Sequence, residues 1–140
     1  MSWEQSLIRI AGYEVELRQK RLAEVVARRE AAEIKLVMLD AEYEAEVAFV
    51  RSEPAASFHQ AGYLAGCKTR RVRILGEIEL VSEEETGARD ALAEAFETQK
   101  KYERVAEAIA RRKAQEAARK ETAEMDELGA RLAARAMPRT

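Results

Sequence analysis

Several residue types are scarce in this 140-residue chain, and each scarcity excludes a class of protein. The single cysteine, Cys67, permits no internal disulfide and fits a reducing compartment. The single histidine, His59, has no second histidine or cysteine at ligand spacing, so we expect no metal site. With only 6 % aromatic residues, the chain has too few large side chains to fill a thick globular core.

Long uncharged apolar runs are missing as well. The chain has no stretch of about 18 apolar residues, and charges occur too near its start for a signal peptide. Its net charge is −2, with acidic and basic residues interspersed, whereas a nucleic-acid-binding protein usually carries a basic face. No Ser, His and Asp are spaced for catalysis. We therefore expect a cytoplasmic protein that is not an enzyme, with no cofactor and no nucleic-acid partner.

One segment, with the sequence GYLAGCKT, is one residue away from a phosphate-binding loop. Gly62, Lys68 and Thr69 occupy the required positions, but Cys67 stands where the second glycine belongs. That glycine provides a backbone turn in which a side chain would be strained, and no apolar strand precedes the segment. We interpret the segment as the weak beginning of a helix.

What the chain has in abundance is charge, at 36 % of residues, a proportion typical of long helices with a narrow apolar seam. Ser2 and Gln5 have the spacing of a capping box, and Pro54 ends the pattern that follows them. Ser57 and Gln60 repeat the spacing, so a second helix can begin there, although Gly62 and Gly66 weaken its first turns. We predict a helix over 3–52, a tip over 53–62 and a helix over 63–136.

Apolar residues recur at heptad spacing along both predicted helices, which is typical of a coiled coil. The first seam comprises Ile8, Ala11, Val15, Arg18, Leu22, Val25, Arg29, Ala32, Leu36, Leu39, Tyr43, Glu46 and Val50. The second comprises Leu64, Cys67, Arg71, Ile74, Ile78, Val81, Glu85, Ala88, Leu92, Ala95, Gln99, Tyr102, Ala106 and Ile109. We predict an all-α fold in which residues 1–140 form one elongated, antiparallel two-helix coiled-coil hairpin with a C-terminal helical overhang.

Four charged residues in the seams are expected to set the register of this hairpin. In the register that we predict, Glu46 faces Arg71, and Arg29 lies one layer from Glu85. A slip by one heptad would place Glu46 and Arg71 opposite apolar residues, which is costly for buried charges. The polar layers therefore favour a single register.

The two predicted helices differ in length, which leaves the end of the second one unpaired. In the predicted register Glu4, near the start of the first helix, faces Lys113, so the chain from Ala114 onward has no partner within the hairpin. An apolar stripe continues there on a new helix face, which indicates an external partner. The stripe comprises Ala114, Ala118, Met125, Leu128 and Leu132.

The first arm contains the segment LIRIAGYEVELRQKRLAEVVARREAAE, and the second contains AFETQKKYERVAEAIARRKAQEAARKETAEMDELGARL. In these segments the two arms resemble the FliJ family of flagellar type III export proteins, most specifically at Glu121 and at Glu124 to Leu128. It implies a non-enzymatic stalk that enters the ring of the hexameric flagellar export ATPase and contacts the cytosolic domain of the export gate. It also implies binding of export chaperones, with the protein peripheral to the inner membrane through its partners.

Two groups of residues are candidates for these contacts. The ATPase-binding group comprises Ala118, Met125, Leu128, Arg131 and Leu132. The gate-binding group comprises Phe49, Phe58 and Tyr63, three aromatic residues near the tip for which local packing is the competing explanation. Two other functions stay open: a self-associating coiled-coil scaffold or adaptor, and a membrane or nucleic-acid binder. The second would use Arg111, Arg112, Lys113, Arg119 and Lys120, with a steep dependence on salt.

Overall fold

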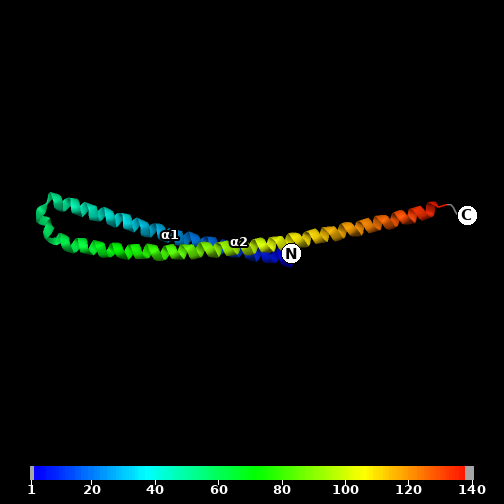
Figure 1. Ribbon diagram of the computed structural model, residues 1–140, viewed down its shortest axis with the longest axis horizontal. Helices are drawn as coiled ribbons and strands as arrows, with labels where there is room; N and C mark the ends of the chain where they lie inside the picture. The colour runs from blue at the N-terminus through cyan, green and yellow to red at the C-terminus, as the bar shows by residue number, and fades with distance from the viewer. Residues whose placement is uncertain (1, 138–140) are drawn as a thin grey trace. The chain divides into compact units, whose positions relative to one another are not determined.

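The computed structural model describes residues 2–137, with the exception of the side chain of Ala56. It contains α1 (Trp3–Ser52), a short 3-10 turn η1 (Pro54–Ala56) and α2 (Ser57–Ala136), which Figure 1 shows in chain order. The described residues contain no β-strand, and the prediction of an all-α hairpin is confirmed. Over the same residues, neither helix has a segment that is both long and apolar enough to cross a membrane.

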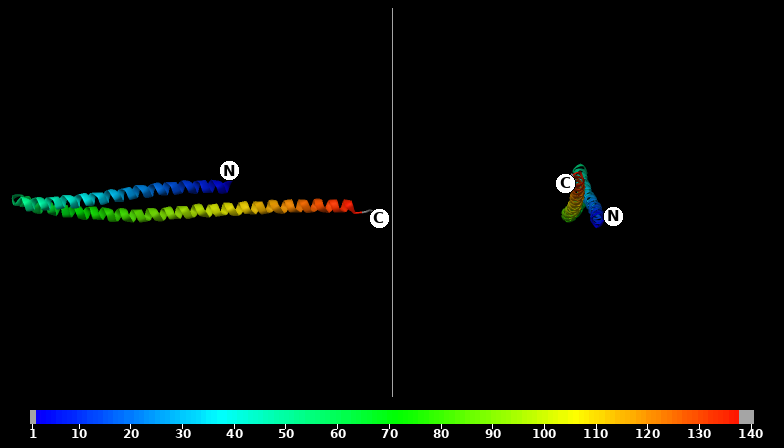
Figure 2. Two further views of the ribbon diagram at one scale, coloured as in Figure 1. Left: turned by 90° about the horizontal axis from the view of Figure 1, so that it is seen from above. Right: turned by 90° about the vertical axis from the view of Figure 1, so that its right-hand side faces the viewer.

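Backbone contacts divide the chain into two units, and each unit contains part of both helices. The first unit, Tyr13–Phe96, is a hairpin in which α1 and α2 lie antiparallel and side by side in the views of Figures 1 and 2. The second unit combines Met1–Gly12 with Glu97–Thr140. In this second unit, every described residue of α2 from Ala110 onward is exposed, so its pairing with α1 ends near Ile109.

Local hydrogen bonds define both ends of α1. The N–H of Gln5 donates to Ser2 Oγ and the N–H of Ser2 donates to Gln5 Oε1, each at 3.4 Å, which is the expected capping box. At the other end, the N–H of Glu53 donates to the carbonyl of Phe49 at 2.9 Å. Glu53 then leaves the helical conformation, as the residue before a proline usually does, and Pro54 starts the turn.

The predicted end of the tip, at residue 62, is wrong. The second helix begins at Ser57 instead of 63, so a connection of only a few residues joins the helices. Gly62 and Gly66 were expected to weaken the first turns, yet neither adopts a positive φ and both continue the helix. Each glycine costs a helix about 1 kcal/mol relative to alanine, which is too little to stop one that packs against α1 through the hairpin unit.

The predicted heptad positions do form the contact between the helices. In the hairpin unit the most buried of them are Val15, Val25, Ala32, Leu39, Cys67, Val81 and Ala95. Almost all of the remaining positions are half-buried; among the described residues, Arg18 and Arg71 are the exceptions, since both are exposed. Long arginine side chains can leave an apolar seam and keep their charged ends in water.

The predicted register is wrong by about one heptad. Arg71 does not pair with Glu46: its Nε donates to Asp40 Oδ1 at 3.0 Å, and it lines a cavity together with Leu39. The early start of α2 explains the slip, because each residue of α2 then lies farther from the tip than expected. The expected cost of burying Arg71 opposite Leu39 does not arise, since the guanidinium reaches Asp40 at the exposed edge of the seam.

Candidate functional site

A ladder of ion pairs joins the two helices in the middle of the hairpin unit. Arg29 Nε donates to Glu85 Oε1 at 2.6 Å and its Nη1 donates to Glu33 at 2.9 Å, so the structure brings the predicted polar residues Arg29 and Glu85 together. Beside them, Arg28 donates to Glu84 at 2.6 Å. Glu85 is the better covered carboxylate, with 15 % of its side chain exposed.

These contacts change the proton affinities of the ladder. The hydrogen bond from Arg29, with a further one from Arg89, lowers the pKa of Glu85 below its ordinary value. The hydrogen bond from Arg28 lowers the pKa of Glu84 in the same way, and the hydrogen bond to Glu85 raises the pKa of Arg29. When they are ionised, both carboxylates therefore stabilise the folded state.

The ladder leads to a prediction for acid. A carboxylate with a lowered folded pKa stabilises the fold above its ordinary pKa, and this contribution disappears as the pH falls through the lowered value. The free energy of unfolding should therefore decrease between about pH 5 and pH 3. Glu85→Gln should make this decrease shallower in urea titrations followed by circular dichroism. The exposed neighbour offers a control, since Glu83→Gln should keep the wild-type slope; equal slopes for all three proteins would contradict the assignment.

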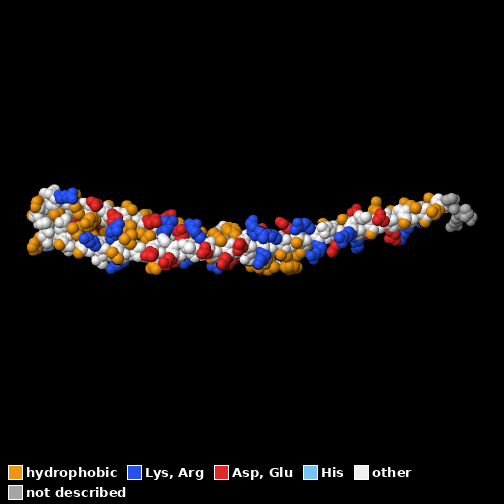
Figure 3. All heavy atoms as spheres, viewed as in Figure 1, with side chains coloured by type: hydrophobic (Ala, Val, Ile, Leu, Met, Phe, Trp, Pro, Cys, Tyr) orange, Lys and Arg blue, Asp and Glu red, His pale blue; other side chains and the backbone are white. Residues whose placement is uncertain are grey.

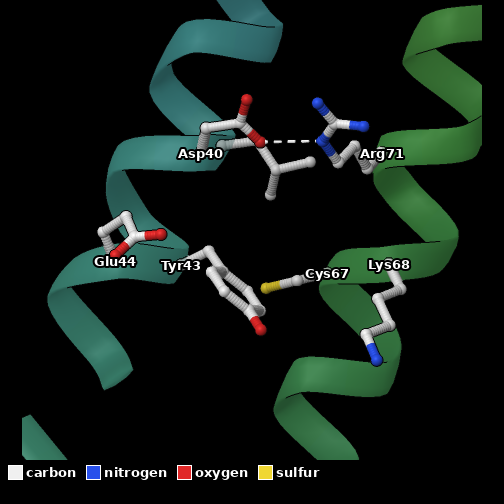
Figure 4. Close-up of a pocket in the computed structure, with 7 residues that line it drawn as sticks. Asp40, Tyr43, Glu44, Cys67, Lys68 and Arg71 are labelled. Carbon is white, nitrogen blue, oxygen red and sulfur yellow. Dashed lines mark hydrogen bonds and ion pairs between the residues drawn. The ribbon is translucent and has the colours of Figure 1, made fainter. Parts of the chain in front are cut away.

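A cavity of about 390 Å³ lies between the helices, toward the tip from the ladder. Figure 4 shows the ring of Tyr43 pointing from α1 toward Cys67 on α2, with the Asp40–Arg71 ion pair beside it. Cys67 is only 2 % exposed, and Arg70 donates to its sulfur at 3.5 Å. A reactive thiol needs access to its reaction partner, so this one is a small seam residue.

The segment Gly62 to Thr69 lies entirely within α2. Thr69 Oγ1 donates to the carbonyl of Ala65 at 3.1 Å, a bond along the helix itself. The backbone N–H groups of a helix interior bond to carbonyls four residues earlier and cannot surround a phosphate. Nor do the described residues contain a group of His, Cys, Asp and Glu side chains that could hold a metal ion.

Of the three aromatic residues predicted for the tip, Phe58 and Tyr63 lie on different faces of α2. Phe58 is 86 % exposed, and its ring meets His59 edge to face with 5.2 Å between the centroids. Tyr63 follows five residues later, on a face about 140° away. The contact with Cys67, four residues further along α2, raises the pKa of Tyr63. Phe49 lies on α1 and is half exposed.

Sequence reasoning missed an apolar face on α1 that ends at Phe49. Ile34, Val37 and Met38 are all more than half exposed and line a shallow hollow, and small apolar residues continue their line toward the tip. We name this surface the α1 outer face: Ile34, Val37, Met38, Ala41, Ala45, Ala48 and Phe49. Its signal was available, since these residues recur every three or four positions on the side of α1 away from the seam.

The unpaired end of α2 carries the residues predicted to bind the ATPase. Met125, Leu128 and Leu132 are all more than half exposed, and an α-helix places them with Ala118 on one face about 80° wide. Arg131 lies beside this face and donates to Glu127 at 2.8 Å. We name the face the α2 end stripe: Ala114, Ala118, Met125, Leu128 and Leu132.

Comparison with known proteins identifies the family of this chain. The model of the family described as "Flagellar FliJ protein" matches residues 5–138. The chain belongs to the FliJ family. Flagellar FliJ proteins from two strains of Caulobacter vibrioides, NA1000/CB15N and ATCC 19089, are each 51 % identical to this FliJ-family chain over 132 residues. The match covers 94 % of the chain and 95 % of each relative, and no solved structure matches it.

The family match spans the features described above. Residues 5–138 include the ion-pair ladder, the α1 outer face and the α2 end stripe of this FliJ-family protein. Exposed apolar surfaces of this kind commonly mark interaction sites.

Proposed function

We propose that this protein is a non-enzymatic component of the flagellar protein export apparatus that links two partners through separate apolar surfaces. The observation that carries this proposal is the α2 end stripe, an exposed apolar line on a helix segment that α1 does not cover. The apolar side chains of this stripe do not contribute to the contact between the helices, whereas the apolar face of an amphipathic helix commonly docks in a groove of a partner.

The partner that we propose for the α2 end stripe is the hexameric export ATPase. Family membership and the resemblance of the whole chain to export stalks support this choice. In this role the single helix enters the ring, and the hairpin remains outside. The phosphate-binding chemistry then belongs to the ATPase, consistent with the helical conformation of Gly62 to Thr69 here.

The partner that we propose for the tip is the cytosolic domain of the export gate, with export chaperones as further partners of the stalk. Phe49 and the α1 outer face offer a continuous apolar surface, and Phe58 adds an exposed ring at the turn. This surface lies in the hairpin unit, whereas the α2 end stripe belongs to the other unit. The protein would thus be peripheral to the inner membrane through its partners.

The decisive experiment is co-purification of the untagged export ATPase with the tagged full-length chain, followed by an assay of ATP hydrolysis. Binding with stimulated hydrolysis would support the stalk. Light scattering on the chain alone distinguishes the competing scaffold function, since a stalk should remain monomeric and a scaffold should form dimers or larger assemblies. Self-association without ATPase binding would replace this proposal with the scaffold.

The gate contact yields its own prediction. Phe49→Ala with Phe58→Ala should weaken binding to the purified cytosolic domain of the gate by about tenfold or more, because an aromatic side chain that the partner covers contributes strongly to affinity. Val72→Ala with Leu80→Ala removes two other exposed apolar side chains farther along α2 and serves as the control. Isothermal titration calorimetry measures both. Equal losses in the two double variants would place the gate contact away from the tip.

A further inference from the structure

We propose that the partner surface for the α2 end stripe is itself helical and places a lysine or arginine against Glu121. The inference rests on the proposed function, in which that partner is the export ATPase.

The spacing of the stripe points to a helical partner. Its positions from Ala114 to Leu132 advance by alternate steps of four and three residues, with Glu121 occupying one of them. This alternation keeps one narrow line of side chains facing another helix, as in a coiled coil. A helix that packs on a flat surface usually has a wider apolar stripe, of about 100° or more, whereas a strict two-position stripe is the seam between two helices.

Glu121 interrupts the apolar stripe near its centre. At about 100° per residue it lies within about 20° of Ala114, so docking of the stripe covers its carboxylate. The residues three and four positions away are Ala117, Ala118, Glu124 and Met125, and none of them can neutralise it. By contrast, Glu127 already pairs with Arg131 within the helix. A covered carboxylate without a cation is strongly unfavourable, so the cation must come from the partner.

A second copy of this chain does not supply that cation in either arrangement that overlaps the two stripes fully. In a parallel pair of stripes, Glu121 would face Glu121 of the other copy. In an antiparallel pair with the stripes fully overlapped, it would face Met125, and Arg111 would face Arg135. Figure 3 shows both signs of charge along this part of α2, which suits a different partner with its own charge pattern.

The test compares two charge reversals on the same exposed helix segment. Glu121→Lys reverses the carboxylate in the stripe, and Asp126→Lys reverses one that lies about 140° around the helix. Asp126 is a matched control because the residues three and four positions from it, Thr122, Ala123, Gly129 and Ala130, also include no cation. Both residues are exposed, so neither change disturbs the hairpin.

Binding of each full-length variant to the purified export ATPase would be measured by biolayer interferometry, with circular dichroism as a check on helix content. We expect Glu121→Lys to weaken binding by about tenfold or more and Asp126→Lys by less than about threefold. Equal effects of the two reversals, with intact wild-type binding, would overturn this inference and leave the proposed function standing. Absence of wild-type binding would overturn both.

Discussion

Ending the chain after Lys113 should leave the melting temperature of the hairpin nearly unchanged and abolish binding to the export ATPase. Every described residue from Ala114 to Met137 is exposed, so the deletion removes no part of the contact between the helices. We expect a shift of less than about 3 °C, since removing exposed residues away from a packed surface has little effect on stability. Binding should fall below detection because the whole α2 end stripe is lost.

A full-length variant separates loss of the stripe from loss of length. Met125→Asp with Leu128→Asp adds two charges to the stripe and should weaken ATPase binding by about 100-fold, as a charge forced into an apolar contact does. Ala123→Asp with Ala130→Asp adds the same charges to the opposite helix face and should bind almost normally. Undiminished stimulation of ATP hydrolysis by the truncated chain would show that the ATPase contact lies elsewhere.

The second large effect concerns the register of the hairpin and uses the native thiol as a reporter. Tyr43→Cys should form a disulfide with Cys67 under mild oxidation, because the two side chains line the same cavity and point toward each other (Figure 4). Val50→Cys should not. It lies seven residues nearer the tip, about 10 Å along α1, beyond the Cα separation that a disulfide spans.

Non-reducing electrophoresis and peptide mass spectrometry measure the cross-link in each protein, and wild type provides the blank. Nearly complete oxidation of the Tyr43→Cys protein with only traces in Val50→Cys would establish the register of Figure 4 in solution. The reverse pattern would restore the register in which Glu46 faces Arg71.

Periodicity predicted the helices and their seams well, because both are local properties. The capping box at Ser2, the break at Pro54 and the heptads depend on residues a few positions apart in the sequence. The difference in helix length alone predicted that the end of α2 is unpaired, although the pairing stops near Ile109 and not at Lys113. The α1 outer face was missed because only one apolar line on that helix was considered.

The register could not be derived in the same way. A heptad pattern that is moved by seven residues still matches apolar positions to apolar positions, so the seam alone does not distinguish neighbouring registers. The charges at Glu46 and Arg71 seemed decisive only on the assumption that both are buried. Arg71 is long enough to reach Asp40 at the edge, which removes the penalty that the prediction relied on.

The sequence by itself thus determined that the chain forms two long helices with a shared seam and an apolar stripe left over on the second. The tertiary structure decided which residues meet across that seam, and with them the ladder of Arg29 and Glu85 and the cavity at Cys67. The physical reason is the turn. The short connection at Pro54–Ala56 sets the register of α2 along α1, and a heptad repeat does not specify the length of that connection.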